Sequence, residues 1–480
     1  MARPHVLNQP LTLSIIALGA ALGYGNLVDF PLLVGAHGGS AFIVIFLLCQ
    51  LFIAVPVLIS ELILGRRSQS DAVHGWGQLA VGRVFGSGWS HIGRAMVVAG
   101  FITLAVYSVL FSWSFSYMLG SAQDVMNSQT DYTRYFLSVI QQYQPLFYYQ
   151  LLFFGILALL VLLSSINGLT VVMLVLVPLI FVLFLIVFIV SLTRVESVET
   201  IWGSMDYVFG WRWHDVTAES FSLALEHSFF SLGVGMGALW FCGSITAKTV
   251  SIGRVALLVV VFDLVASLLV ALIFSFLGVF SDNVATGPGL LFQYLPSLLP
   301  PPTMLVFYFA MVLTGITSAM LIIEGLVLTT MNRFKVSKTL ATLWVCIVAL
   351  FLGLLGQTSY NIHAHIYWYG RTIFENYSML ASGFIVPLSG VLLAFFVGWV
   401  MRSDDAKDEW KPSLVWRFWL WRWTLRIISI IAIMLVFFAA LKRHLGLEFY
   451  TALSITFLCS LFLFLLSQFS QISSKNHGPN

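Results

Sequence analysis

The sequence predicts an all-α polytopic membrane protein with twelve transmembrane helices. Of its 480 residues, 59% are hydrophobic and only 9% are charged, whereas a soluble globular protein carries about a quarter charged residues. The apolar residues gather in segments of about 20, the length that a helix needs to cross a bilayer. The alternation of apolar and polar residues that membrane strands require is not visible, so these segments are expected to be helices.

The twelve segments follow one another along the whole chain. They are expected at about 11–35, 40–64, 91–119, 147–164, 168–193, 220–244, 252–280, 303–330, 338–356, 378–401, 418–440 and 447–470. The four cysteines, Cys49, Cys242, Cys346 and Cys459, lie inside apolar segments at spacings that fit no metal site, so we expect them to be packing residues.

The distribution of Lys and Arg predicts the orientation. With the N-terminus inside, 17 of the 23 Lys and Arg residues fall on the cytoplasmic side, so both termini are expected in the cytoplasm. The loop at 194–219 carries more acids than arginines, as an outer loop should. The basic cluster from Lys407 to Arg426 is expected to be a lipid-facing anchor, with a specific lipid site as the alternative.

Two segments are interrupted where a plain membrane span would be continuous. The first contains "ALGYGNLVDFPLLVGAHGG" (20–38), in which glycines, Asn26, Asp29 and Pro31 break the apolar run, and the sixth contains "FFSLGVGMGALW" (229–240). Glycine-interrupted segments at matching positions in two halves point to the central site of a transporter. Glycines that serve only close helix packing are the alternative.

These two segments head two sets of five helices. Since five is odd, the second set must be inverted relative to the first. The expected organisation is an inverted-repeat 5+5 core at 1–402, with repeat one at about 8–193 and repeat two at about 219–402. Helices 11 and 12 follow at 403–470, and a cytoplasmic tail at 471–480.

Five motifs together resemble the neurotransmitter:sodium symporter family, especially its bacterial amino-acid transporters. They are "GYGNLVDFPLLVGAHGGSAF", "ELILGRR", "FFSLGVGMG", "TGITSAM" and "PLSGVLLAFFVGWVM". The resemblance implies a sodium-coupled symporter of the bacterial inner (plasma) membrane that imports an amino acid, or a related small amine or carboxylate, by alternating access. Helices 1, 2, 6 and 7 would rock against the rest, and one or two sodium ions would be used.

The resemblance also implies the ligands. Sodium site 1 would use Ala21, Asn26, Ser231 and Asp263, and sodium site 2 would use Gly19, Leu22, Thr314, Thr317 and Ser318. Oxygen ligands suit a hard cation, although adjacent hydroxyls on an apolar helix commonly bond to their own backbone. The substrate site would be formed by Ala21, Tyr24, Gly25, Thr103, Tyr107, Phe230, Ser231, Gly233, Met236 and Ile322, with room for a large or aromatic side chain.

Three further residues have gating or supporting roles by the same resemblance. Glu61 would support the unwound part of helix six, with a proton site as the alternative. Asp29 stands where the family has an outer-gate Arg, and its usual partner position is Ser378, with Glu375 one turn away. Asp29 therefore either attracts a cation or basic substrate, or simply lies in a wet vestibule.

The same resemblance raises the questions of proton coupling and of chloride binding. His227 could pair with Asp263 and make transport pH-sensitive or support proton counter-transport, or it could be a hydrogen-bonded neutral residue. Ser267 matches a chloride ligand of some relatives. Because Asp263 lies one turn away and already carries negative charge, chloride is not expected.

Other function classes fit the sequence less well. His363 and His365 form only an HxH pair, without the further ligand that a metalloenzyme would need, so no enzymatic activity is expected. The cytoplasmic loops are too short for a nucleotide-binding domain. The remaining alternative is a sodium-dependent sensor that binds an amino acid with little transport. The expected partners are the lipid bilayer and the small substrate, and nucleic acid is not expected. The protein is expected to be a monomer or homodimer.

Overall fold

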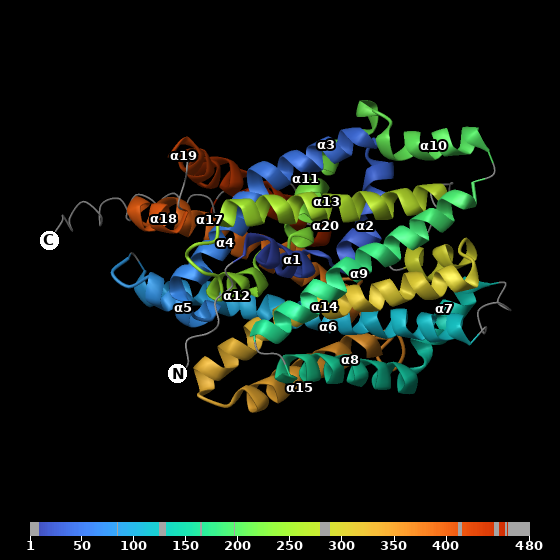
Figure 1. Ribbon diagram of the computed structural model, residues 1–480, viewed down its shortest axis with the longest axis horizontal. Helices are drawn as coiled ribbons and strands as arrows, with labels where there is room; N and C mark the ends of the chain where they lie inside the picture. Colours follow the sequence, from blue (N-terminus) through green and yellow to red (C-terminus); the bar gives the residue numbers. More distant parts are fainter. Residues whose placement is uncertain are drawn as a thin grey trace.

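The structure is a computed structural model that describes residues 9–83, 85–123, 131–163, 166–195, 197–278, 289–410, 415–445, 451–456 and 458. Within these residues the secondary structure is helical, apart from two isolated β-bridges (Figure 1). The predicted all-α fold class is confirmed. The expected helix 12 falls mostly, and the tail at 471–480 entirely, outside the described residues, as does Cys459.

Nine long helical segments of the described residues are apolar enough to cross a membrane. They are Ser40–Ser68, Gly86–Ala122, Tyr143–Leu163, Gly168–Thr193, Ile252–Phe276, Pro301–Phe334, Lys338–Thr358, Ile373–Val400 and Trp416–Arg443. A tenth span is a bent pair, α1 (Pro10–Ala21) and α2 (Tyr24–Ala36), whose axes meet at 71°. The predicted sixth segment is also divided, into α11 (Ala218–Ser231) and α12 (Ala238–Ser244).

The helices that make up these spans have the following bounds. They are α3 (Ser40–Cys49), α4 (Val55–Ser68), α6 (Ser90–Ala122), α8 (Tyr143–Leu163), α9 (Ile166–Thr193), α13 (Ile252–Phe276), α14 (Pro301–Phe334), α15 (Lys338–Thr358), α16 (Ile373–Ser378), α17 (Val386–Phe395), α19 (Val415–Trp423) and α20 (Ile430–Leu445). Three spans contain π-helical turns. The second span contains η1 (Gln50–Ala54), the tenth contains η7 (Met379–Ile385) and η8 (Phe396–Val400), and the eleventh contains η9 (Thr424–Ser429). A further π-helical turn, η5 (Leu290–Tyr294), precedes α14.

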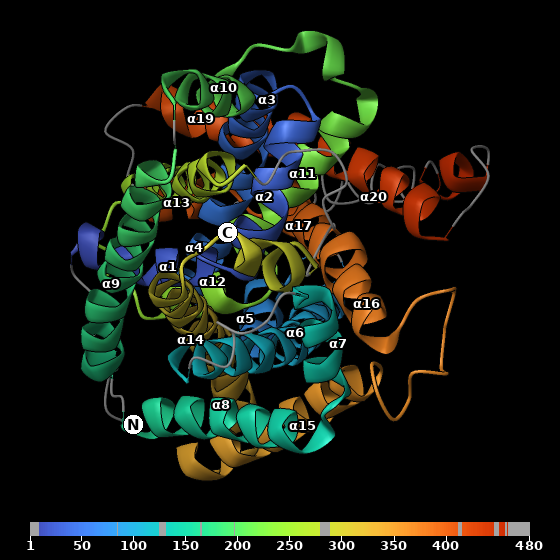
Figure 2. The same ribbon diagram turned by 90° about the vertical axis from the view of Figure 1, so that its right-hand side faces the viewer.

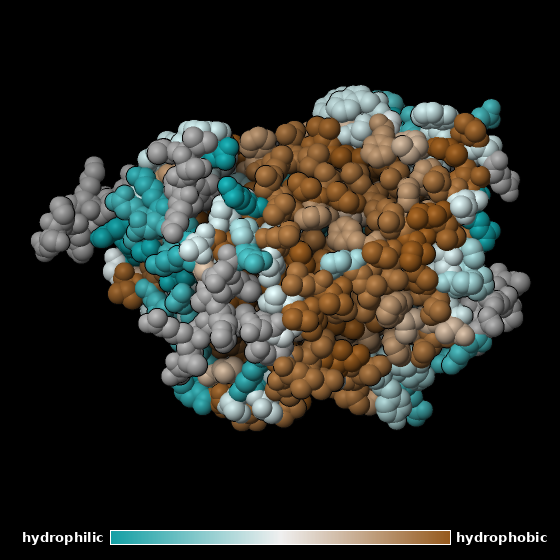
Figure 3. All heavy atoms as spheres, in the orientation of Figure 1, coloured by the Kyte–Doolittle hydropathy of each residue, from teal (hydrophilic) through white to brown (hydrophobic). Residues whose placement is uncertain are grey.

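Short helices lie at the two ends of the molecule. Helices α5 (Ala72–Leu79) and α18 (Ser403–Trp410) lie at one end, and α7 (Tyr132–Gln141) and α10 (Val198–Phe209) at the other (Figure 1). Between the ends, the face shown in Figure 3 is a continuous hydrophobic band, with hydrophilic residues gathered at both ends. This is the surface of a protein that sits across a bilayer.

The broken first span lies inside the bundle. Helix α1 contacts α9, α12, α13 and α14, and α2 contacts α11 and α13. Figure 2 shows α1, α2 and α12 enclosed by α9, α13, α14 and α17. The irregular backbone of both breaks is therefore surrounded by protein, which is the condition for tolerating it at membrane depth.

An ion-pair network fastens α18 to the end of the second span. The buried guanidinium of Arg66 is 2.8 Å from a carboxylate oxygen of Glu409, and it also donates to the carbonyls of Glu409 and Val250. Beside it, Arg67 and Arg83 lie 2.6 and 3.0 Å from the carboxylate of Asp405. These contacts connect segments that are more than 300 positions apart.

The interpretation of the Lys407–Arg426 cluster as a lipid-facing anchor is wrong for Arg422, which is buried. Arg422 is buried and donates to the Met401 carbonyl at 2.7 Å, and Arg426 donates to the Gly398 carbonyl at 2.7 Å. Both satisfy carbonyls at the end of the tenth span, where a helix leaves acceptors without intrahelical donors. Cys49, Cys242 and Cys346 are buried free thiols, in agreement with packing roles.

Candidate functional site at the two broken helices

The break in the first span is two residues long. The Leu22 N–H closes α1 on the Leu18 carbonyl at 2.7 Å, and the Gly23 N–H turns back to the Ala21 carbonyl at 2.8 Å. Helix α2 starts again at Tyr24. The first N–H groups of a helix have no acceptor within that helix, so those of Tyr24 and Gly25 remain as donors at the break.

The break in the sixth span is held open by glycines and one carboxylate. Gly233, Gly235 and Gly237 have φ values of +64°, +82° and +82°, a region that residues with a Cβ rarely adopt. The buried Glu61 accepts hydrogen bonds from the backbone N–H groups of Gly235 at 2.7 Å and Trp240 at 3.3 Å. Glu61 thus takes the place of carbonyls that an unbroken helix would supply to these N–H groups, and its supporting role in transport stays a prediction.

Asp263 of α13 joins the two broken spans. Its carboxylate accepts from the Asn26 amide at 2.7 Å and from the Ser231 hydroxyl, which lies 2.7 and 2.6 Å from its two oxygens. All three side chains are buried. The structure therefore brings together the three side chains that were expected to form sodium site 1. The fourth expected ligand, the carbonyl of Ala21, lies at the end of α1 and accepts from the Gly23 N–H.

Gln50 is a member of this cluster that the sequence analysis did not identify. Its amide donates to the second oxygen of Asp263 at 2.7 Å, and it opens the π-helical turn η1. Its only signal in the sequence is its polarity in the middle of the apolar second segment. The side-chain oxygens of Asn26 and Gln50 are buried acceptors without a hydrogen-bond donor. The Asn26 oxygen, unpaired beside a buried carboxylate whose partners are all neutral, suits a hard cation.

The residues expected to form sodium site 2 are assembled only in part. Ser318 of α14 donates to the Ala20 carbonyl of α1 at 3.0 Å, so α14 and the first break are in direct contact. The hydroxyls of Thr314 and Thr317 instead donate to carbonyls of their own helix, at 2.8 Å for Thr314 and 3.1 Å for Thr317. Gly19 faces α9, because a Cβ added to it would lie 2.9 Å from the Met173 sulfur.

Aromatic residues surround the first break. A Cβ on Gly23 would lie 2.6 Å from the Tyr107 hydroxyl, and one on Gly25 would lie 2.8 Å from the Phe230 ring. The rings of Tyr24 and Tyr107 meet edge to face, with centroids 5.3 Å apart. Because these two glycines lack a Cβ, the side chains of Tyr107 and Phe230 can lie close to the N–H groups that have no acceptor within α2.

The residues expected to line the side-chain pocket come from three spans. The Thr103 hydroxyl of α6 lies 3.7 Å from the Met236 sulfur in the break of the sixth span. A Cβ on Gly233 would lie 3.3 Å from the Ala20 carbonyl. Ile322 of α14 is buried and faces Gly100 of α6, where an added Cβ would lie 3.2 Å from it. Thr103, Met236 and Ile322 are thus close to one another beside the sixth-span break, and Gly233 lies next to α1.

A cavity of about 460 Å³ leads from this site towards the end of the molecule that carries α7 and α10. Tyr24, Gly25, Tyr107 and Phe230 contribute to its lining, which connects it to the first break. Besides these tyrosines, its walls include five polar residues, Asp29, Arg371, Glu375, Ser378 and Ser382. Arg371 is a basic residue that the sequence analysis did not associate with Asp29, because it precedes the tenth span in a loop.

His227 does not pair with Asp263, so that hypothesis is wrong for this structure. The partners of Asp263 are Asn26, Gln50 and Ser231, while the His227 ring packs between Phe30 and Phe46, with centroids 5.6 and 5.5 Å away. Its Nε2 and the hydroxyl of Ser267 are both buried without a hydrogen-bond partner.

The chain is similar to known proteins in both sequence and structure. The model of the sodium:neurotransmitter symporter family matches residues 7–139 and 132–472. The uncharacterised sodium-dependent transporter YhdH of Bacillus subtilis is 30% identical over 433 residues, which cover 88% of this chain and 94% of that protein. An uncharacterised sodium-dependent transporter of Haemophilus influenzae is 24% identical over 417 residues, covering 83% and 90%. The crystal structure of MhsT in complex with L-phenylalanine matches with a TM-score of 0.81 and 27% identity, covering 92% of this chain and 100% of MhsT.

Proposed function

The chain belongs to the sodium:neurotransmitter symporter family, and from this premise we propose that it imports an amino acid, or a related small amine or carboxylate, together with sodium by alternating access. The observation that carries the proposal is the junction at Asp263, where both broken spans meet one buried carboxylate. A site on two breaks from different halves of the chain can respond to a relative movement of those halves.

Sodium at the first site would neutralise Asp263. Its ligands would be the Asp263 carboxylate, the Asn26 side-chain oxygen, the Ser231 hydroxyl and the Ala21 carbonyl. Gln50 would hold the carboxylate in place from the opposite side, at 2.7 Å. Since a buried charge costs several kcal/mol unless it is paired, a cation is strongly favoured beside this carboxylate.

A second sodium would bind between α1 and α14. The carbonyls of Gly19, Leu22 and Thr314 and the hydroxyls of Thr317 and Ser318 would be its ligands. Ser318 already contacts α1 at the Ala20 carbonyl. The hydroxyl oxygens of Thr317 and Ser318 keep lone pairs for a cation while their protons are donated elsewhere.

The substrate would lie between the two breaks. Its carboxylate would accept from the Tyr24 and Gly25 N–H groups, at the positive end of α2, and from the Tyr107 hydroxyl. Its ammonium group would donate to the carbonyls of Ala21, Phe230 and Ser231. Thr103, Gly233, Met236 and Ile322 would surround the side chain, with Phe230 as the outer lid.

The absence of a side chain at Gly233 supports a large or aromatic substrate side chain. The structural match to MhsT, which was solved with L-phenylalanine, also supports an aromatic substrate. Met236 is flexible enough to adapt its shape to more than one side chain.

Coupling would arise because the substrate carboxylate and the sodium ion at site 1 bind next to each other. Each would then raise the affinity of the other by the same factor. The membrane potential would contribute about 2.3 kcal/mol per transported charge per 100 mV. Negative charge at Asp263 would repel chloride from the neighbouring Ser267, so we propose transport that does not require chloride.

The outer cavity would attract and select charged solutes. Asp29 lines it together with Glu375 and Arg371, so both signs of charge are present on its walls. In place of an Arg–Asp pair between the first and tenth spans, we propose that Asp29 acts with Arg371 when the cavity closes. Both termini would lie in the cytoplasm, on the side of α5 and α18.

The test is uptake into proteoliposomes of the proteinogenic amino acids, each radiolabelled, with sodium or potassium outside. Sodium-dependent accumulation of one group of amino acids supports symport and names the substrate. Sodium-dependent binding without accumulation favours the alternative, a membrane sensor that transports little. If sodium changes neither binding nor uptake, the proposed ion ligands are wrong. Replacing external chloride with gluconate tests chloride in the same assay.

A further inference from the structure

A second cavity, distinct from the transport site, lies on the bundle surface between α6, α14 and α15. It has a volume of about 760 Å³. Its walls are largely apolar, formed by residues such as Val97, Val98, Phe101, Trp344 and Val348, and two arginines, Arg94 and Arg333, stand at one end. We infer that this groove is a binding site for an anionic phospholipid.

The two arginines mark the polar end of the groove. Arg94 is the fifth residue of α6, near its N-terminal end, Arg333 lies in the last turn of α14, and both are exposed. Within the described part of the chain, neither forms an ion pair with a carboxylate, and the one side-chain contact of Arg94 is with His91 at 3.4 Å. Guanidinium groups without a carboxylate partner are well suited to bind a phosphate.

The apolar wall extends from the arginines into the hydrophobic band. Phe101 lies two turns beyond Arg94 along α6, which is about 10 Å at 1.5 Å per residue. Val98 and Trp344 expose 48% and 56% of their surface there, so the groove needs an apolar occupant. Charge at one end and about 10 Å of apolar wall match the phosphate and acyl chain of a phospholipid. A free soluble anion would use only the arginines.

The charge distribution predicts that this end of the bundle is cytoplasmic. The ends of α6 and α14 that carry the arginines lie towards α5, which packs on both of these helices. Each Lys or Arg near a cytoplasmic membrane surface raises the affinity for anionic lipids about fivefold. The groove thus has the right charge for a lipid of the inner leaflet.

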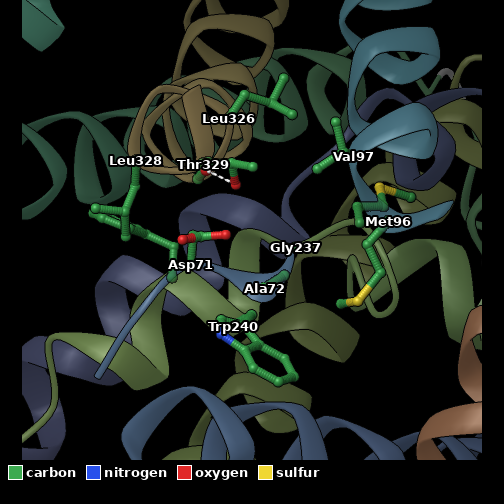
Figure 4. A pocket seen from close by; sticks show the side chains of 12 residues that line it. Asp71, Ala72, Met96, Val97, Gly237, Trp240, Leu326, Leu328 and Thr329 are labelled. Atoms are coloured by element: carbon green, nitrogen blue, oxygen red, sulfur yellow. Dashed lines mark hydrogen bonds between the residues drawn. The ribbon is translucent and has the colours of Figure 1, made fainter. Parts of the chain in front are cut away.

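The groove adjoins the break in the sixth span. A small cavity behind it is lined by Met236, Gly237 and Trp240 of the sixth span, and it shares Val97 and Thr329 with the groove. Figure 4 shows Val97 and Thr329 on the side of this cavity opposite Trp240, with the Thr329 hydroxyl bonded to the Gly325 carbonyl at 2.9 Å. A lipid in the groove would therefore pack against the residues that separate it from the break.

The experiment is native mass spectrometry of the full-length protein titrated with equal amounts of palmitoyl-oleoyl phosphatidylglycerol and phosphatidylcholine. The double variant Arg94→Gln/Arg333→Gln removes the charge, and Val98→Trp fills the groove without changing charge. Arg254→Gln is the matched charge control, because Arg254 is exposed at the same predicted side on α13. Val261→Trp is the matched size control, since Val261 is 47% exposed on α13, outside the groove.

We expect wild type and both controls to retain phosphatidylglycerol in preference to phosphatidylcholine. The double arginine variant should bind phosphatidylglycerol roughly thirtyfold more weakly, and Val98→Trp should lose binding of both lipids at this site. Equal retention of phosphatidylglycerol by the groove variants and the controls would overturn the inference. So would competition by glycerol phosphate at the same phosphate concentration, because a free anion would then suffice. Neither result depends on transport, so the proposed function is tested separately.

Discussion

The side chains of Asn26 and Asp263 meet at 2.7 Å although 237 positions separate them in the sequence. Asn26 belongs to the half-helix that follows the first break, and Asp263 belongs to a continuous helix of the second half of the chain. The contact makes the geometry of the first break depend on the position of α13.

Removing the charge of Asp263 should weaken sodium binding. We expect Asp263→Asn to raise the sodium concentration for half-maximal substrate binding by roughly tenfold to a hundredfold, since interactions of a charged group contribute about 1.5–3 kcal/mol. Scintillation proximity binding across a sodium titration measures this. Asp404→Asn is the control, because Asp404 is 93% exposed on α18. An unchanged sodium midpoint in Asp263→Asn would show that the first site lies elsewhere.

Gln50 should matter for sodium affinity even though it is not proposed to touch the ion. We expect Gln50→Leu to weaken sodium binding by roughly fivefold to tenfold, because the Asp263 carboxylate loses a donor at 2.7 Å. Gln150 is a matched control, since it is a buried glutamine that donates to the Gly353 carbonyl at 3.3 Å. Gln150→Leu should affect thermal stability and leave the sodium midpoint in place. Similar sodium midpoints in the two variants would show that Gln50 does not contribute to sodium binding.

Gly25 should tolerate no side chain. An added Cβ would lie 2.8 Å from the Phe230 ring, so we expect Gly25→Ala to displace the ring and weaken substrate binding by at least about tenfold. Gly155→Ala is the control, because a Cβ there would meet no atom within 4 Å. The double variant Gly25→Ala/Phe230→Ala should bind better than Gly25→Ala alone if the clash is the cause. Equal affinities of single and double variant would assign the loss to the backbone.

Glu61 should control the shape of the sixth-span break. Glu61→Gln keeps the size of the side chain but replaces one acceptor oxygen with a donor that faces a backbone N–H. We expect a loss of about 1–3 kcal/mol in the free energy of unfolding and a fall in maximal uptake. Thermal unfolding in detergent and proteoliposome uptake measure the two effects. Unchanged stability and uptake would indicate that the glycines hold the break without help.

The charges of the outer cavity should influence which substrates enter. If Asp29 attracts cations, Asp29→Asn should lower the uptake of lysine and arginine more than that of neutral amino acids. This difference should shrink as ionic strength rises, because salt screens exposed charges. Arg371→Gln should have the opposite effect on cationic substrates. Equal effects on all amino acids at low salt would mean that Asp29 lies in the cavity without selecting its contents.

The sequence was sufficient for the main features of the fold because they follow from local composition. Apolar segments of sufficient length predicted the spans, and glycine with Asn26 in one of them predicted the break between Ala21 and Tyr24. Asp263 was conspicuous as an acid in an apolar helix. Its meeting with Asn26 and Ser231 was predicted through the family resemblance, because spacing alone does not bring distant helices together.

The features that were missed depend on long-range packing or loop shape. Gln50 has a role only because a π-helical turn directs it towards α13, and no periodicity reveals such a turn. Arg371 reaches the outer cavity from a loop, whose path is not predictable from hydrophobic pattern. The burial of Arg422 follows from the packing of the eleventh span on the end of the tenth, which the basic cluster in the sequence did not indicate.

The buried pair of Arg66 and Glu409 has a consequence for how this end of the molecule opens. Separating the pair inside protein would leave a charge without a partner, at a cost of about 3–5 kcal/mol. The same separation is much less costly where water replaces each lost partner. In the proposed transport cycle the second span would therefore separate from α18 only as water enters the space between them. Opening at this end would then be a wetting transition, and its rate should depend on the activity of water.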